Sequence, residues 1–183
     1  RNAVELALTP GLVVYVDESA DTDTANGSQE FPYATLSAAL GDACILDSSC
    51  SQIRIATGHY DGAAEQFPAS VPRGVSISGS WQPQTPNWLP ASTHQDGTTF
   101  TFDQASASYS LGADVSLSHL AFEIDHALST PLLDFGDDDP GQLALLSNTF
   151  ILNNAASGAA IIESHKPSDP LLPRSQVSLR NNI

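Results

Sequence analysis

The stretch LALLSNTFILNN, residues 143–154, is strongly apolar, but its apolar residues do not recur at helical spacing, and it ends in two asparagines. Two related segments, VSLSHLAFEI at 115–124 and VSLRNNI at 177–183, share its alternating pattern. Alternation of apolar and polar residues is typical of half-buried β-strands. The three segments together predict that the chain repeats one β unit.

The spacing of the repeated unit points to a stack of coils. Similar segments begin at Val75, Val115, Leu143 and Val177, at offsets of 40, 28 and 34 residues. A recurrence of this size is typical of stacked repeats, although it is too irregular for a strict solenoid code. A β-sandwich stays open as an alternative, because its strands also recur between turns. Stacking is favoured because each copy holds two or three short strands, and because the Asn-Gly and Asp-Gly pairs that hairpins prefer are scarce.

One helix is expected near the start, at residues 34–43, where the spacing of apolar residues changes to that of a helix. Thr35 or Ser37 could cap it. The first strand is expected at 11–17, and residues 81–98, which contain three prolines, read as a long surface loop. We therefore expect a single domain over 1–183, with an N-terminal cap and first coil at 11–62, and further coils at 63–183.

The charge balance excludes several partners. The 183 residues carry 21 acids and 6 bases, for a net charge of −15, and only 15% of residues are charged. Nucleic-acid backbones and anionic membrane surfaces would repel such a chain. We expect no membrane insertion, because no apolar run approaches the roughly 20 residues that a spanning helix needs.

The two cysteines, in CILDSSC, have two interpretations. A zinc site would need further ligands, of which His59 is the nearest, so we favour a disulfide between Cys44 and Cys50. Such a bond would contribute about 2 kcal/mol on the loop-entropy estimate. It would also indicate an oxidising, extracytoplasmic compartment. The chain begins with Arg1 and contains no methionine, which suggests a processed or truncated product.

The N-terminal third resembles a known family. The segments VYVDESADTDTANGSQEFPYATLSAAL, IRIATGHYDG and GVSISGSW follow one another as in the start of right-handed parallel β-helix proteins of the pectin-lyase-like superfamily, and more narrowly in the DUF1565-type start of bacterial secreted proteins. The resemblance covers residues 13–81. It implies an all-β, right-handed parallel β-helix with a short N-terminal capping α-helix. It also implies that the cysteine pair forms a small disulfide loop between helix and strand.

The resemblance leaves the function open, because the superfamily contains lyases, glycoside hydrolases, adhesins and plain scaffolds. We expect a secreted or cell-surface structural or adhesive module. The alternative is a carbohydrate-active enzyme whose site lies in more distal coils. Since VSLRNNI reads as a coil cut after its first corner, we also expect further coils or another protein chain to cover the C-terminal end near Ile183.

Few residues suggest chemistry. Glu123 and Asp125 alternate on one strand and are the best candidates for a catalytic carboxylate pair, although the pattern also fits an outward polar face. Two acidic turns could bind Ca²⁺, although we favour the interpretation that they are solvated turns. Trp81 and Trp88 could stack on a carbohydrate or a partner, or could anchor their loop. The calcium candidates are Asp17, Asp21 and Asp23 in one turn, and Asp134, Asp137 and Asp139 in the other.

Overall fold

Strands that recur in one order along the chain build three parallel sheets. The computed structural model describes residues 12–61, 64–67, 69–84, 87–91, 97–102, 107–125, 127–135, 141–153, 161–164 and 176–182. Sheet A contains, in order, β1 (Leu12–Val16), β2 (Cys50–Ala56), β5 (Ser76–Gln82), β9 (Val115–Ser118), β12 (Gln142–Leu146) and β15 (Gln176–Arg180). Sheet B contains β3 (Gly58–Asp61), β7 (Thr98–Phe102), β10 (Leu120–Ile124) and β13 (Thr149–Leu152). Sheet C contains β4 (Ala69–Val71), β8 (Tyr109–Leu111), β11 (Leu133–Phe135) and β14 (Ile162–Ser164).

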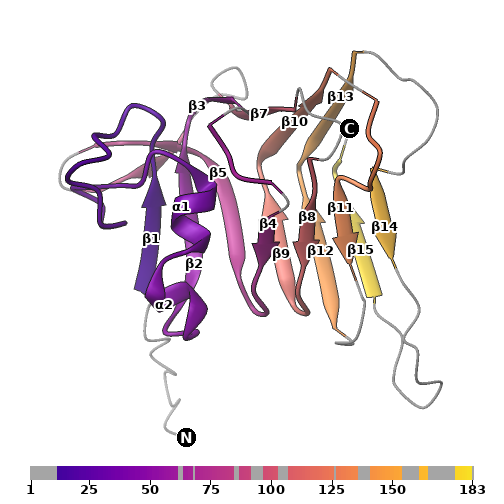
Figure 1. The fold of residues 1–183 in the computed structure, drawn as a ribbon, viewed down its shortest axis with the longest axis horizontal. Helices are drawn as coiled ribbons and strands as arrows, with labels where there is room; N and C mark the ends of the chain where they lie inside the picture. Colours follow the sequence, from indigo (N-terminus) through magenta and orange to yellow (C-terminus); the bar gives the residue numbers. More distant parts are fainter. Residues whose placement is uncertain are drawn as a thin grey trace, which may run out of the picture.

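The chain visits the three sheets in turn. The four coils that begin with β2, β5, β9 and β12 each contribute one strand to sheet A, one to sheet B and one to sheet C, and these strands pair in parallel with their counterparts in the neighbouring coils. In Figure 1 the strands, drawn as arrows, lie side by side along the long axis of the molecule. This all-β arrangement is that of a parallel β-helix, and parallel crossovers of this kind are right-handed in nearly all proteins. The expected fold class is therefore confirmed, and the sandwich alternative is wrong.

The repeated segments stack in register, as their alternation predicted. Val115 pairs with Leu143, which pairs with Val177, and Leu117 pairs with Leu145 in the same two coils. The side chains of Val115, Leu117, Leu143 and Leu145 are buried between the sheets. Because strand side chains alternate between faces, the residues between them point outward. The repeat in the sequence is thus the period of one coil.

Aromatic rings form a column behind sheet B. Tyr60, Phe100, Phe122 and Phe150 occupy paired positions on successive strands, with ring centroids 5.0, 6.2 and 5.2 Å apart. Offset stacking at these distances adds to the free energy gained from burying the rings. The column runs through four coils and fixes the register of sheet B.

The corner that follows the sheet A strand has the same backbone conformation in four successive coils, those of β5, β9, β12 and β15. Ser80, His119, Ser147 and Asn181 all have positive φ, between 53° and 60°. The next residue in two of these corners is an asparagine. Asn148 accepts from the Leu120 amide and donates to Leu117, while Asn182 accepts from the Asn148 amide and donates to Leu145. These two asparagines thus join successive coils along the corner.

Two short helices, rather than the one expected at 34–43, form the cap. They are α1 (Leu36–Leu40) and α2 (Ala43–Leu46), and the chain turns between them because Asp42 begins a new helix by accepting from the Cys44 amide. Thr35 is the N-cap of α1, as expected, and accepts from the Ala38 amide. Leu36 and Leu40 are buried in the core.

The cap closes the first edge of the stack. The loop before α1 bonds to the outer edge of β1: the Tyr15 amide donates to Gly27, the Tyr33 amide donates to Tyr15, and the Asp17 amide donates to Tyr33. Glu18 accepts from the His59 amide at the edge of β3. Gly27 has a φ of 76°, and a Cβ atom there would lie 2.6 Å from the Tyr33 ring, so this turn requires glycine.

Among the described residues, the stack ends at its opposite edge with β15. Every residue of β15 is exposed, including Val177 at 38% and Leu179 at 60%. Val177 and Leu179 continue the inward columns of Leu143 and Leu145, yet among the described residues no strand pairs with the far edge of β15. An unpaired strand edge with apolar side chains is a template for further β structure.

The expected loop at 81–98 begins later than predicted and contains a hairpin. Trp81 and Gln82 belong to β5, where Trp81 pairs with Ala56 and Gln82 pairs with Leu89 of the antiparallel strand β6 (Leu89–Pro90). The prolines in this segment predicted a loop and not a strand. Pro90 is nevertheless tolerated in β6, because β6 is an edge strand of two residues that pairs only with β5.

Candidate functional site

Glu123 and Asp125, the predicted carboxylate pair, are brought together on the outer face of sheet B by an asparagine from the next coil. The Asn153 Nδ2 atom donates to Glu123 Oε1 at 2.7 Å and to Asp125 Oδ1 at 2.8 Å. Because both oxygens accept from the same nitrogen atom, the distance between them cannot exceed the sum of these two distances. Both acids are partly exposed, so the pair lies on an outward polar face that solvent reaches. One amide shared by two carboxylates also stabilises the pairing of β10 with β13.

A second polar contact lies on the same face. The Thr101 Oγ1 atom and the His59 Nε2 atom are 2.8 Å apart. Thr101 pairs with Glu123 across β7 and β10, so this contact lies beside the carboxylate pair. The sequence did not single out this neighbourhood, because its members come from four coils and share no local motif.

Two of the acids proposed for Ca²⁺, Asp17 and Asp21, have local hydrogen-bond partners. Asp17 Oδ1 accepts from the Ser19 amide and hydroxyl, and Asp21 Oδ1 accepts from the Asp23 amide. Such bonds are typical of turns that aspartate closes with its own side chain. No group of three or more His, Cys, Asp or Glu side chains suited to a metal lies within the described residues. Asp134 lies in β11, and Asp137 and Asp139 lie outside the described residues.

The two tryptophans differ in their surroundings. Trp88 is only 5% exposed and packs edge-on against Tyr15, with ring centroids 4.9 Å apart, so it anchors the insertion to sheet A. Trp81 is partly exposed; Arg54 lies 4.2 Å from its ring centroid, and its Nε1 atom donates to Ser78. Of the two indoles, Trp81 is the one whose surface a ligand could still reach.

Two arginines of the described chain, Arg54 and Arg73, have partners away from the carboxylate pair. Arg73 forms an ion pair of 2.9 Å with Asp114, which joins neighbouring coils at a corner of the stack. Arg54 lies over Trp81 on sheet A. A lyase would need a base beside its acids, and neither arginine is placed next to Glu123 and Asp125.

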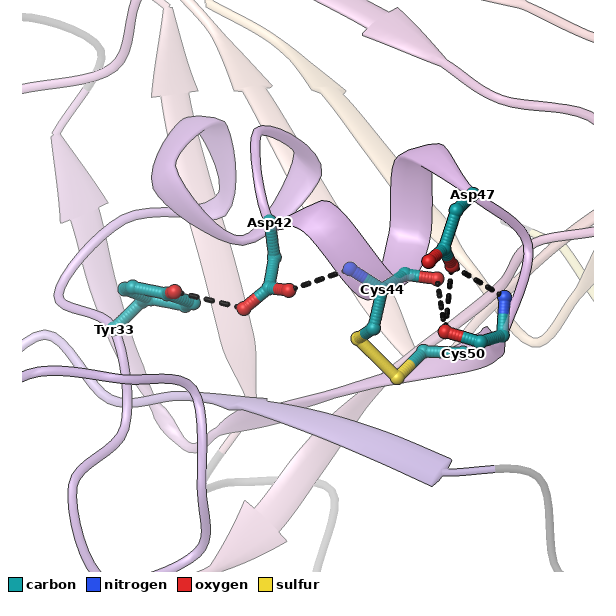
Figure 2. Close-up of a disulfide and its surroundings, with 6 residues drawn as sticks. Tyr33, Asp42, Cys44, Asp47 and Cys50 are labelled. Atoms are coloured by element: carbon teal, nitrogen blue, oxygen red, sulfur yellow. Dashed lines mark hydrogen bonds between the residues drawn. A yellow bond between two sulfur atoms is a disulfide. The ribbon is translucent and has the colours of Figure 1, made fainter.

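The predicted disulfide between Cys44 and Cys50 is present and joins α2 to the start of β2. Figure 2 shows it beside a chain of hydrogen bonds in which Tyr33 donates to Asp42 and Asp42 accepts from the Cys44 amide. Burial, and then the bond to Asp42, raise the pKa of Tyr33 to about 12. The side-chain and backbone bonds from Ser49 lower the pKa of Asp47, in the loop that the disulfide closes.

A shallow hollow of about 80 Å³ lies along the corner between sheets A and B. Its walls come from three successive coils and include the corner residues with positive φ. The lining residues are Ser80, Gly97, Thr98, His119, Leu120, Ala121, Ser147 and Thr149. Sequence reasoning missed the hollow, because only the coil register brings these segments together. The three related segments that each turn this corner were the available signal.

The geometry defines a parallel β-helical protein that a helix pair caps at its N-terminal end. Residues 20–104 match the family model described as "Protein of unknown function (DUF1565)". The resemblance predicted from the sequence is thereby confirmed for this segment, which spans the cap loop, both helices and the strands from β2 to β7. Comparison with curated proteins and with solved structures found no match. No helix in the described part of the chain has both the length and the apolar character needed to cross a membrane.

Proposed function

We propose that this chain is a secreted or cell-surface β-helical module with a structural or adhesive role, and that further coils or another protein chain cover its C-terminal end. The observation that carries the proposal is the contrast between the two ends. Backbone bonds, Glu18 and α1 close the edge at β1 and β3, whereas Val177 and Leu179 present apolar side chains at an unpaired edge. A capped edge at one end and an exposed apolar edge at the other suit a module to which further coils or another chain are added.

The location outside the cytoplasm is supported by the Cys44–Cys50 bond, since disulfides persist mainly in oxidising compartments. The net charge of −15 also suits a module that works in an aqueous surrounding, because a net charge far from zero favours solubility. Digestion of intact cells that carry the protein tests this part of the proposal. A surface module is cleaved by added protease, and a protein that stays intact until the cells are lysed contradicts the proposal.

The open end is tested by the solution behaviour of the 183-residue chain. We expect the chain to self-associate with rising concentration in sedimentation experiments, and to bind an apolar dye. Leu179→Lys should suppress both effects, because the lysine places a charge on the apolar edge. Leu89→Lys is the matched control, since Leu89 is 49% exposed but lies on β6, away from this end. A monomeric chain that binds no dye would contradict the proposal.

A carbohydrate-active enzyme is the second candidate, and the Glu123–Asn153–Asp125 contact favours it. Retaining glycosidases place two carboxyl groups about 5 Å apart, which this pair can match. Reducing-end assays on a panel of polysaccharides test the idea, with Glu123→Gln and Asp125→Asn as variants. An enzyme that uses the pair loses at least about 100-fold in rate in either variant, by analogy with typical acid–base contributions. Absence of product, or activity that both variants keep, removes this candidate.

A further inference from the structure

The loop that covers the outer edge of β1 contains an asparagine followed by a glycine. Asn26 is exposed to solvent, whereas Gly27 is buried. Of the asparagines in the sequence, only Asn26 precedes a glycine. Because glycine has no Cβ atom, its backbone nitrogen can reach the side-chain carbonyl carbon of the preceding asparagine with little steric hindrance. This pair is therefore the place in the chain where an asparagine loses its amide group most readily.

Deamidation at such a pair needs no reagent except water. The Gly27 nitrogen attacks Cγ of Asn26 and gives up its proton, the Cγ–Nδ2 bond breaks, and ammonia leaves a five-membered succinimide ring. Water then opens the ring at one of its two carbonyl carbons. Opening at Cγ gives aspartate, and opening at the main-chain carbon gives isoaspartate, in which the backbone runs through the side-chain carbon atoms. No atom is oxidised or reduced in either step.

In the folded cap, the two groups that would react are engaged in hydrogen bonds. The Gly27 amide donates to the Phe31 carbonyl at 3.0 Å, and Asn26 Oδ1 accepts from the Ser28 amide at 3.0 Å. The Gly27 carbonyl also accepts from the Tyr15 amide at 2.9 Å, on the outer edge of β1. The attack would have to break the first two of these bonds. The loop must therefore open before Asn26 reacts.

The helices of the cap hold this loop closed. A Cβ atom at Gly27 would lie 2.6 Å from the Tyr33 ring and 3.2 Å from the Asp42 carboxylate. The Tyr33 hydroxyl donates to Asp42 Oδ2 at 2.7 Å, and Asp42 Oδ1 accepts from the Cys44 amide at 2.8 Å. Since Cys44 is bonded to Cys50, the packing against Gly27 depends on the position of α2.

We propose that Asn26 is a deamidation site that reacts when the cap loop opens, and that isoaspartate formed there keeps the loop from closing again. Isoaspartate adds a carbon atom to the backbone directly before Gly27, so the bonds of Gly27 to Tyr15 and to Phe31 cannot both form again. The outer edge of β1 then stays unpaired and is open to other strands. This inference concerns the capped end and does not rest on the proposed function.

Incubation of the intact chain at mildly alkaline pH, with and without guanidinium chloride, tests the proposal. Peptide mass mapping follows the loss of the amide at Asn26, and labelling by an isoaspartyl methyltransferase measures isoaspartate. We expect deamidation to be at least about tenfold slower in the folded chain than in denaturant, because the folded chain reacts only through local opening. Asp42→Ala should speed the reaction of the folded chain, since Tyr33 and α2 lose the partner they share.

Asp47→Ala is the matched control, because Asp47 is another acid of the cap, whose carboxylate accepts from Ser49 beyond the end of α2. Its rate of deamidation should equal that of the unmodified chain. Asn26→Ser removes the side-chain amide and keeps an oxygen that can accept from the Ser28 amide. In this variant no isoaspartate should form at position 26.

The effect on the cap is measured on the isoaspartate form after its separation by ion exchange. Hydrogen exchange at the Tyr15 amide should be faster in this form than in the unmodified chain, because its partner carbonyl at Gly27 has moved away. The proposal is overturned if Asn26 reacts equally fast in the folded and the denatured chain, if Asp42→Ala reacts like Asp47→Ala, or if the isoaspartate form retains the protection of Tyr15.

Discussion

At the scale of single residues, the carboxylate of Glu65 connects the first coil to the cap. Glu65 is 6% exposed, and it accepts from the amides of Leu36 and Ser37 and from the Ser37 hydroxyl. It therefore satisfies amides at the start of α1 that have no partner within the helix. No sequence pattern indicated this role, since Glu65 follows the helix by more than 20 residues.

We expect Glu65→Ala to lower the free energy of unfolding by about 3 kcal/mol, because bonds to a charged acceptor are worth roughly 1.5–3 kcal/mol and buried amides would lose their partner. Glu65→Gln should cost less, since its carbonyl oxygen still accepts. Urea denaturation measures both values. Glu30→Ala, at an exposed acid of the cap loop, should leave the midpoint unchanged. An equal effect of Glu65→Ala and Glu30→Ala would show that the carboxylate does not hold the cap.

Three tyrosines make the fold sensitive to alkali. Burial raises the pKa of Tyr33 to about 12, and burial also raises the pKa of Tyr60 and of Tyr109. In the unfolded chain the same groups lose their protons near pH 10. Between these values the unfolded chain binds fewer protons than the folded chain, so stability is complete below pH 10 and falls as the pH rises.

Stability measured by denaturation at a series of pH values should therefore be flat from pH 8 to pH 9.5 and should decline between pH 10 and pH 12. Replacing Tyr33 by phenylalanine should make the decline shallower, while lowering stability at neutral pH through loss of the bond to Asp42. Tyr15→Phe is the control, because its ring packs on Trp88 at the surface of sheet A. A decline that Tyr33→Phe leaves unchanged would contradict the assignment.

At the scale of elements, the disulfide ties α2 to β2 across a short loop. We expect reduction, or the double change Cys44→Ala and Cys50→Ala, to lower stability by about 2 kcal/mol on the loop-entropy estimate. Thermal denaturation with and without a phosphine reductant measures the effect. The double variant should be insensitive to reductant, and the reduced chain should be heavier than the intact chain by two hydrogen atoms. A chain that denatures identically in both conditions would show that α2 does not depend on the bond.

The elements show what the sequence could and could not predict. Alternation in the segments from Val115, Leu143 and Val177 indicated inward columns, and the register confirms them, because alternation is a property of each strand alone. The break between α1 and α2 was missed, since it depends on Asp42 capping a second helix. The strand pairing of Trp81 was missed because prolines nearby suggested a loop.

The surface groups were predictable only in part. Glu123 and Asp125 could be placed on one face from their spacing, but the amide that joins them comes from Asn153, in the next coil. His119, Ser147 and Gly97 line one hollow although they belong to three coils. Contacts between coils depend on the lengths of the connecting turns, and these vary along the chain. Contacts between coils therefore cannot be predicted from local sequence patterns.

At the scale of the whole molecule, each coil contacts chiefly its two neighbours, so stability is distributed along the stack. We expect amide hydrogen exchange to be slowest in β5 and β9, which are paired on both sides, and fastest in β15, whose outer edge is open within the described residues. Peptide-resolved exchange under native conditions measures the gradient. Adding a reductant should speed exchange in α2 and β2 and should leave β12 unchanged. Uniform exchange across all coils would show that the stack unfolds as one unit.

The closed edge at β1 has a consequence for how such a protein is made. The cap and its disulfide lie within residues 12–50 of a chain whose strands then stack in the order of the sequence. Synthesis and export both deliver a polypeptide from its N-terminus, and domains generally form in that order. The strands of each new coil can therefore pair with the coil that folded before it, and they do not depend on residues later in the sequence. Folding of this kind can keep pace with delivery, and at every moment only the newest coil has unpaired strand edges.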